Sequence, residues 1–366
     1  LPNLSYKILQ GNSLIQKYKN YDFDNEYEKT ELFPDEETKN IKKELIEIQK
    51  KYFNLTSRKR KKETRELLDK KIESLISKGN KHNFLMDEER NFFLWKIFFL
   101  DVFQNGGFDL IIGNPPYVFA RSSKEKGITE EDKKYFYKNY SLIDYKINYY
   151  ILFIEIATKI LKKSGYISFI IPNNWMTIST NESMRKFILD KKNITIINFI
   201  KKVFISASVD ASIVAFENSN STESELLLME YDDNFKKIAK TKTSFFKNGA
   251  YIINFELVKN KEIAKLFWEI EKKSIKISQI SKVRQGLIAY GVGGGIPKQN
   301  KKMKDDKIYH SEKKLDDSYY KYLESNDIHR YKFNWSGQFL KYGDNLFRKR
   351  EFNIYQGERL LIKQIP

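Results

Sequence analysis

The stretch FDLIIGNPPY, residues 108 to 117, decides the fold more than any other part of this chain. Its apolar run, Leu110 to Ile112, is typical of a strand buried on both faces of a parallel sheet. Gly113 ends the run by removing the side chain where backbones must approach closely. Such a strand delivers Asn114 to the carboxyl edge of a sheet, where open α/β folds build their sites. We therefore expect a functional site that begins at Asn114.

Two consecutive prolines stiffen the turn after Asn114. They fix φ and remove two N–H donors, which leaves the carbonyls of Asn114 and Pro115 as acceptors with no competing donors beside them. The Asn114 amide oxygen and a backbone carbonyl can then both accept from one exocyclic amino group. Tyr117 supplies a ring on which a planar base can stack. The alternative is an ordinary Asn-Pro turn that leaves a buried strand.

This run resembles the catalytic motif of amino-methyltransferases that use S-adenosylmethionine, and in particular of N6-adenine DNA methyltransferases. Three further stretches resemble the same group: residues 11–14, 95–103 and 152–175. Together they resemble the methyltransferase part of Eco57I-type (type IIG-like) restriction-modification proteins, which is TaqI-methyltransferase-like. The resemblance covers most of the chain. It implies a Rossmann-like α/β methyltransferase sheet, S-adenosylmethionine as the cofactor and double-stranded DNA as the partner.

The resemblance also implies roles for individual residues. The catalytic motif consists of Asn114, Pro115, Pro116 and Tyr117. The cofactor would contact Asn12, Ser13 and Asn114, and the target base would stack on Tyr117 and Phe204. Asn12 stands where an Asp is common, so it can accept a hydrogen bond from the cofactor's adenine without charge assistance. Taken alone, Asn12 belongs to an ordinary Gly-Asn turn, and Phe204 is a core aromatic at a strand end.

Composition limits the classes of partner and site. Among 366 residues, 66 Lys and Arg against 48 Asp and Glu give a net charge of +18, which favours a polyanion. The absence of Cys excludes disulfides and thiolate metal sites, and the three His residues have no ligand-like spacing, so we expect no metal. Apolar runs are too short to span a bilayer, so we expect no membrane partner and a cytoplasmic location. The resemblance implies a bacterial source.

We divide the chain into a methyltransferase catalytic domain at 1–217 and, at 218–366, a linker with the start of a recognition domain. The first domain opens with a strand at 6–9 and contains a basic helical insertion at about 18–105. Two apolar stripes predict a helical hairpin there, Ile41, Leu45, Ile48, Tyr52, Leu55 and then Leu68, Ile72, Leu75. We expect the second helix to start after an N-cap at Thr56 and to stop near Gly79.

The basic face of this insertion is a candidate DNA contact. Its residues Arg58, Lys59 and Arg60 can lie along DNA phosphates. A solvated helix face accounts for the same charges equally well.

Strands and helices alternate between residues 106 and 217. We expect a polar loop at 121–138 that folds over bound DNA, and a helix at 145–163 with Leu152, Ile156 and Ile160 on its buried side. Later elements follow as a strand at 166–171, a helix at 183–189, and strands at 194–200 and 209–216. Such alternation is typical of a doubly wound α/β domain.

The region after residue 217 changes character, with shorter strands. The glycine tract at 291–295 lacks the spacing of a dinucleotide fingerprint and indicates a flexible or tightly bent loop. Residues 280–363 resemble the α+β target-recognition domain of TaqI-like enzymes. Such domains read base edges in the major groove, and the candidate DNA-binding residues here are Arg284, Gln285 and Lys298.

Members of the resembled family begin with a strand and a glycine-rich turn that hold the methionine part of the cofactor. Neither pattern precedes Gly11, and the chain begins with Leu1. The resemblance thus implies that the first strands of the sheet are missing and that the N-terminal part of the same polypeptide, which would carry any nuclease domain, is absent. We expect the 366 residues alone neither to bind S-adenosylmethionine well nor to methylate DNA.

The resulting hypothesis is a site-specific DNA adenine-N6 methyltransferase of a restriction-modification system. The adenine amine is a poor nucleophile, so Asn114 Oδ1 and the Pro115 carbonyl would localise its lone pair on a flipped base. One alternative is a protein-glutamine N5-methyltransferase, which shares the N-P-P-Y motif; the long region after residue 217 speaks against it. The other is a non-catalytic DNA-binding specificity subunit.

Overall fold

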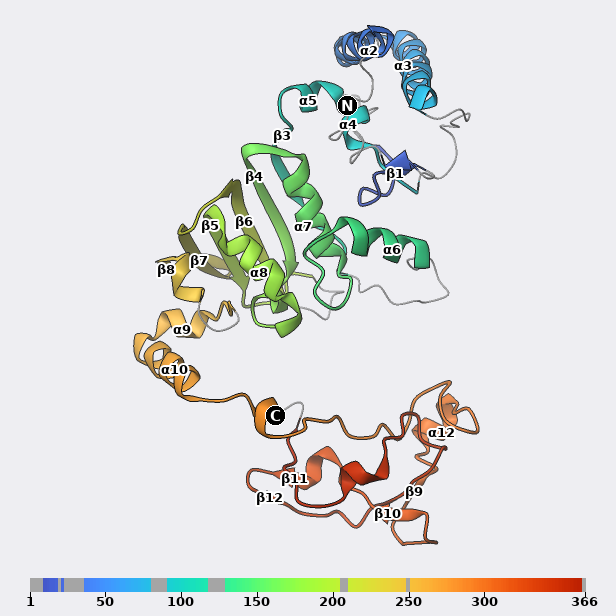
Figure 1. Ribbon diagram of the computed structural model, residues 1–366, viewed down its shortest axis with the longest axis vertical. Helices are drawn as coiled ribbons and strands as arrows, with labels where there is room; N and C mark the ends of the chain where they lie inside the picture. Colours follow the sequence, from blue (N-terminus) through green and yellow to red (C-terminus); the bar gives the residue numbers. More distant parts are fainter. Residues whose placement is uncertain are drawn as a thin grey trace. The chain divides into compact units, whose positions relative to one another are not determined.

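The computed structural model describes seven stretches of the chain, residues 9–18, 21–22, 36–79, 91–117, 129–204, 210–247 and 251–363 (Figure 1). It divides into two compact units, Leu1–Lys272 and Lys273–Pro366. Each unit has its own apolar core. Most of the strand expected at residues 6–9 lies outside the described residues.

A six-stranded mixed sheet forms the centre of the first unit. Its strands are β3 (Phe108–Gly113), β4 (Leu161–Pro172), β5 (Lys191–Phe199), β6 (Ala211–Asn220), β7 (Glu225–Asp232) and β8 (Asn234–Lys242). Their spatial order is β3-β4-β6-β5-β7-β8. The pairs β3–β4 and β5–β7 are parallel, whereas β6 is antiparallel to both of its neighbours. The α/β class is confirmed, with a mixed rather than a fully parallel sheet.

The reversal at β6 follows from the length of its connection. Only residues 200–210 separate β5 from β6. A parallel crossover needs a dozen or more residues, usually with a helix. The chain therefore returns beside β5 in the opposite direction.

Two helices cover β4 and β5 (Figure 1). They are α7 (Tyr149–Ile160), which packs on β4, and α8 (Glu182–Leu189), which packs on β5. The predicted buried side of α7 is confirmed, since Leu152, Ile156 and Ile160 are buried. The predicted end at residue 163 is wrong, because Leu161 is already extended and pairs with Phe108. Sheet pairing here ends the helix earlier than the apolar pattern suggests.

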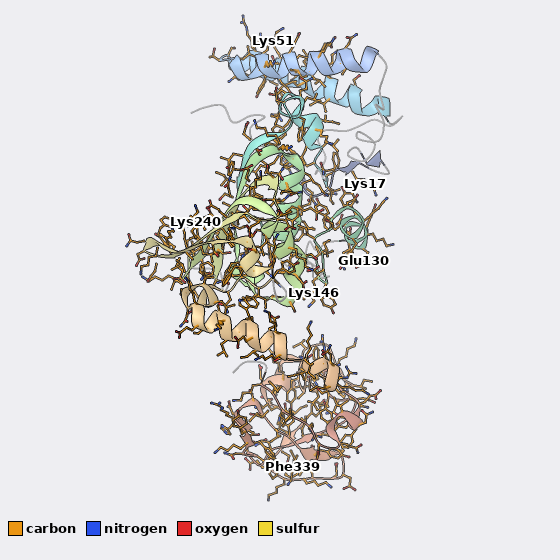
Figure 2. The ribbon with its side chains drawn as sticks, turned by 60° about the vertical axis from the view of Figure 1, so that its left-hand side comes forward. Lys17, Lys51, Glu130, Lys146, Lys240 and Phe339 are labelled. Carbon is orange, nitrogen blue, oxygen red and sulfur yellow. The ribbon has the colours of Figure 1, made fainter. Side chains whose placement is uncertain are left out.

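The predicted helical hairpin is confirmed as α2 (Glu36–Asn54) and α3 (Arg58–Gly79). Its inner side buries Ile41, Leu45 and Leu68 in a cluster with Phe93 and Phe98. Phe93 comes just before the short helix α4 (Trp95–Phe98), and Phe98 is its last residue. The helix α5 (Leu100–Gln104) follows α4. Figure 2 shows Lys51 on the exposed side of α2.

The start of α3 differs by one residue from the predicted one. The Ser57 carbonyl accepts a hydrogen bond from Lys61 N at 3.0 Å. Ser57, and not Thr56, therefore precedes the helix. A short hairpin of β1 (Lys17–Tyr18) and β2 (Tyr21–Asp22) comes before α2.

A helix replaces the second half of the loop predicted at residues 121–138. It is α6 (Glu130–Asn139), and Thr129 caps it through a reciprocal pair of 3.0 Å hydrogen bonds with Asp132. Phe136 anchors the helix in the core beside Leu152. The loop prediction is wrong from residue 130 onward, because the capping box was overlooked. Residues 118–128 lie outside the described part.

The strands β7 and β8 extend the same sheet beyond residue 217. The division proposed at 217 falls inside β6, which continues to Asn220. Two helices, α9 (Phe255–Lys259) and α10 (Lys261–Lys273), follow β8. The sheet-bearing unit thus continues to Lys272.

The second unit is a small α+β structure. Its strands are β9 (His310–Ser311), β10 (Tyr319–Lys321), β11 (Ile328–His329), β12 (Lys332–Phe333) and β13 (Phe339–Lys341). Two short helices, α11 (Ile277–Ile280) and α12 (Lys301–Asp305), precede them. The order of one sheet is β10-β13-β9, and β11 pairs with β12 as a hairpin.

The glycine tract of this unit is tightly bent and packed. The buried Gln299 side chain donates to the carbonyls of Ala289 and Asn345 at 2.9 and 2.6 Å. A Cβ atom on Gly291 or Gly294 would lie within 2.5 Å of the Phe347 ring. Of the two forms predicted from the sequence, the bent loop is confirmed.

Candidate active site

The candidate active site lies at the carboxyl edge of the six-stranded sheet. Because β3 and β4 are parallel, both end at this edge, as does β5. The antiparallel β6 begins at this edge. Asn173 follows β4 directly and Asp210 directly precedes β6, and Asn173 N donates to Asp210 O at 2.9 Å. The Asn173 amide also donates to Asn198 Oδ1 at 3.0 Å. Polar groups from three strands therefore meet at the edge that the motif reaches.

Gly113 ends β3 for a steric reason. It pairs with Phe169 of β4, and a Cβ atom on Gly113 would lie 2.9 Å from that ring. Since real Cβ atoms do not approach other heavy atoms so closely, the aromatic residue of β4 requires glycine here. The chain can then turn at Asn114 without disturbing the sheet.

The turn at residues 114–116 is partly buried and partly exposed. Pro115 is buried, whereas Asn114 and Pro116 are exposed. Within the described part of the chain, no hydrogen bond engages the Asn114 amide. Its oxygen and nitrogen therefore remain available to a bound molecule, on a turn that two prolines hold rigid.

Tyr117 and Phe204 touch each other. Their ring centroids lie 6.2 Å apart with an interplanar angle of 72°, an edge-to-face contact. The structure thus brings together the two aromatic residues that the sequence proposed as a stacking pair. They do not stand parallel, so a planar base cannot lie between them unless one ring turns.

The Tyr117 hydroxyl is a buried donor without a partner. Among the described residues, it has no hydrogen bond. Burial raises the pKa of this phenol above its usual range of about 10, so the hydroxyl keeps its proton at neutral pH. It can therefore donate to an acceptor on a bound molecule.

The strand β3 is not buried on both faces, contrary to the prediction. Leu110 and Ile112 are 54% and 73% exposed. β3 is the edge strand of the sheet, with β4 on one side. An apolar run shows that a strand can be buried, but whether it is buried depends on which other elements pack against it.

The proposed cofactor residues lie in a turn that rests on α7. Asn12 Oδ1 accepts from Leu14 N at 3.2 Å, and the Ser13 carbonyl accepts from Trp95 Nε1 at 3.0 Å. Leu14 packs in one cluster with Leu152. No described contact joins Asn12 or Ser13 to Asn114, and their role in cofactor binding stays a prediction.

The proposed DNA-binding residues lie in both units. Lys59 and Arg60 are exposed on α3, which begins at Arg58; the side chain of Arg58 is outside the described part. In the second unit, the exposed residues are Arg284, Gln285 and Lys298. These positions are accessible, and their contact with DNA stays a prediction.

Sequence reasoning missed further polar groups at this edge. Lys201, just after β5, lies 2.9 Å from Asp232 and also contacts Asp233, at the end of the parallel neighbour β7. Hydrogen bonds to Asp233 and Asp232 raise the pKa of Lys201 above its usual range. Asn174 holds a buried Oδ1 with no partner in the described residues. The sequence signal that could have found Lys201 and Asn174 is a polar residue shortly after an apolar strand.

A family comparison covers this site. Residues 38–204 match the Eco57I restriction-modification methylase family. This part of the chain is similar to members of that family. The match includes both Asn114 and Phe204, so the matched region contains the candidate active site together with the helical hairpin.

Several curated proteins resemble this chain. A predicted type II restriction enzyme and methyltransferase of Methanocaldococcus jannaschii, RM.MjaORFECS2P, is 26% identical over 300 residues, which are 81% of this chain and 24% of that protein. The type II methyltransferase M.TthHB8I of Thermus thermophilus is 32% identical over 111 residues, 30% of this chain and 26% of that protein. The chain spans about a quarter of the length of these relatives.

One similar solved structure is that of the type ISP restriction-modification enzyme LlaGI, a nuclease-deletion mutant in complex with a DNA substrate mimic. Its sequence is 18% identical to this chain, and the TM-score is 0.30. The match covers 40% of this chain and 16% of that one. In the described part of the chain, no helix combines the length and apolar character needed to cross a membrane. Nor do three His, Asp or Glu side chains gather there as metal ligands.

Proposed function

We propose that this chain supplies the base-facing part of a DNA adenine-N6 methyltransferase of a restriction-modification system. The main support is the arrangement at the end of β3, where an unbonded Asn114 amide precedes a ring, Tyr117, that touches Phe204. The similarity of residues 38–204 to the Eco57I family agrees with this proposal.

The reacting amine determines what the protein must provide. The lone pair of an adenine N6 amine is delocalised into the ring, so the amine attacks poorly. Hydrogen-bond acceptors that hold its protons favour a lone pair localised on nitrogen. Asn114 Oδ1 and the Pro115 carbonyl are such acceptors on a rigid turn, and fixed dipoles of this kind contribute on the order of 10²–10³ in rate.

The target base must leave the duplex to reach this turn. Extrusion costs a few kcal/mol, and stacking on an aromatic side chain returns roughly 1–3 kcal/mol per base. Tyr117 offers such a ring and Phe204 a second. A base between them requires a change from their edge-to-face contact.

The residues present are compatible with S-adenosylmethionine. This cofactor would supply the methyl group from its sulfonium. Asn12, Ser13 and Asn114 would hold it. Asn12 Oδ1 already accepts from Leu14 N, but an amide oxygen has two lone pairs and keeps one acceptor position.

Two other functions use parts of the same site. A glutamine side chain also presents a planar amide NH₂, so Asn114 and Pro115 would serve a protein-glutamine methyltransferase equally well. The second compact unit, with exposed Arg284, Gln285 and Lys298, favours a nucleic acid. A specificity subunit without catalysis would keep the DNA surface and show no methyl transfer.

Methyl transfer from labelled S-adenosylmethionine to duplex DNA tests the proposal. It is measured with the 366-residue chain and with the natural protein that carries it, followed by nucleoside analysis. In the natural protein we expect N6-methyladenine, and a loss of at least about 100-fold in rate for Asn114→Ala. The control is Asn105→Ala, an exposed asparagine after α5 whose side chain donates to Asp101 O.

Two results would overturn the assignment. Transfer at the normal rate by Asn114→Ala would remove this amide from the chemistry. Methyl label on glutamine rather than on adenine would identify the protein substrate instead.

A further inference from the structure

The hairpin β11–β12 is an exposed part of the second unit. Every residue from His329 to Asn334 is exposed. Its two aromatic residues, Tyr331 and Phe333, are 92% and 61% exposed. A folded protein rarely leaves two large rings in water on one short hairpin without a partner for them.

The base of the hairpin is held firmly. Asp327 is buried, and its Oδ2 accepts from Glu324 N at 2.9 Å and from Ser336 Oγ at 3.0 Å. Asn334 N donates to the Asp327 carbonyl at 2.8 Å. The exposed residues therefore project from a fixed support.

Tyr331 occupies an unfavourable backbone conformation. Its φ of 62° lies in the left-handed region, where hairpin turns normally place Gly, Asn or Asp. A bulky residue there is an outlier, and its exposed ring gains nothing from burial. Such conformations concentrate at functional positions, where a partner offsets the strain.

The charges on the hairpin have one sign. Arg330 and Lys332 flank Tyr331, and residues 328–335 contain no Asp or Glu. Of the nearby carboxylates, Asp327 is engaged at the hairpin base, and Glu324 bonds Lys307 at 2.8 Å. The Arg330 guanidinium lies 5.2 Å from the Tyr331 ring centroid. Cations around an exposed ring suit a polyanion that carries planar groups.

We propose that the β11–β12 hairpin enters a groove of duplex DNA. Arg330 and Lys332 contact phosphates on either side of the groove, and Tyr331 packs its ring against the sugars and base edges within it. This inference rests on the proposed function, because it takes DNA as the substrate. It adds a contact element that neither the catalytic motif nor the three candidate residues of this unit include.

The test is binding of the 366-residue chain to a fluorescent DNA duplex at several salt concentrations. Each phosphate contact contributes roughly 0.9 to the slope of log K against log salt. The double variant Arg330→Ala with Lys332→Ala should therefore flatten the slope by roughly 1.8. Tyr331→Ala should weaken binding about tenfold at every salt concentration and leave the slope unchanged.

The matched control is Lys236→Ala with Lys237→Ala. It removes the same charge from exposed positions on β8, in the other unit. We expect it to keep the wild-type slope. Circular dichroism should show all variants folded, because every substituted side chain is exposed.

Three outcomes would overturn the inference. Equal flattening by the control pair would mean that total charge and not the hairpin binds DNA. Normal affinity of Tyr331→Ala and of the hairpin pair would exclude the hairpin and leave the proposed methyl transfer intact. A wild-type chain that binds no duplex DNA would count against both proposals.

Discussion

At the scale of single residues, His310 combines a buried ring with neighbours that disfavour its charge. Its Nδ1 lies 2.9 Å from the Tyr290 hydroxyl, and its buried Nε2 has no hydrogen bond among the described residues. Burial lowers the pKa of His310 and nearby Lys307 lowers it further, whereas Glu324, 3.9 Å away, opposes them. The folded ring is therefore neutral at physiological pH.

This histidine predicts acid sensitivity of the second unit. An unfolded histidine has a pKa of about 6.5, above that of folded His310, so the unfolded chain binds the proton more readily. Stability from the neutral ring is thus complete above pH 6.5 and lost as pH falls below it. We expect the denaturation midpoint to fall between pH 7.5 and 5.5, and to fall less in His310→Gln.

Carboxylates also titrate as pH falls and change the midpoint of both proteins. The effect of His310 is therefore the difference between the midpoint shifts of the wild type and of His310→Gln. An identical pH dependence of the two proteins would contradict the assignment to His310. Near-ultraviolet circular dichroism can follow the second unit through its stacked Tyr290 and Tyr309 rings.

At the scale of elements, α6 shows how a few local bonds determine a helix. Its sequence is mostly polar, and one buried ring, Phe136, ties it to the core. The reciprocal hydrogen bonds between Thr129 and Asp132 satisfy backbone donors that a helix start otherwise leaves free.

Removal of this cap should loosen α6 specifically. Thr129→Ala is expected to lower the stability of the helix by about 1 kcal/mol. Hydrogen exchange of the α6 amides measures this as faster exchange. The control is Thr64→Ala inside α3, where the threonine bonds only the Arg60 carbonyl. Alanine is the better helix former there, so α3 should not exchange faster. Unchanged α6 protection in Thr129→Ala would refute the capping role.

At the scale of the whole molecule, the chain contains two separately packed units. Three apolar clusters lie within residues 1–272, and a fourth, which includes Tyr309 and Leu340, lies within the second unit. At the boundary of the two units, every residue from 271 to 286 is exposed. Exposed connections with few buried contacts open easily and are preferred sites of proteolysis.

Limited trypsin digestion should therefore separate the units. The exposed stretch carries cleavage sites at Lys272, Lys273, Lys276, Lys282 and Arg284. We expect early fragments whose ends map to these residues by mass spectrometry, with the sheet and β9–β13 protected. Loss of β4 or β13 while the 272–284 connection remains whole would contradict the division.

Elements set by interactions between residues close in the sequence were predictable from the sequence, and features set by contacts between distant residues were not. The stripes at Ile41, Leu45 and Leu68 predicted α2 and α3, because a helix repeats every 3.6 residues. The apolar runs predicted β3, β4 and β6. The end of α7 was misplaced because pairing between Leu161 and Phe108 joins residues far apart in the chain. The overlooked capping box at Thr129 was local and could have been found.

For the candidate site, the sequence by itself determined the identity of the motif, its position at the end of a strand and the rigidity of its turn. These are local properties of glycine, proline and an apolar run. Only the tertiary structure decided that Tyr117 meets Phe204 edge to face, that β3 is an exposed edge, and that β7 and β8 join the same sheet. Such contacts join residues distant in sequence, so they depend on how the whole chain packs.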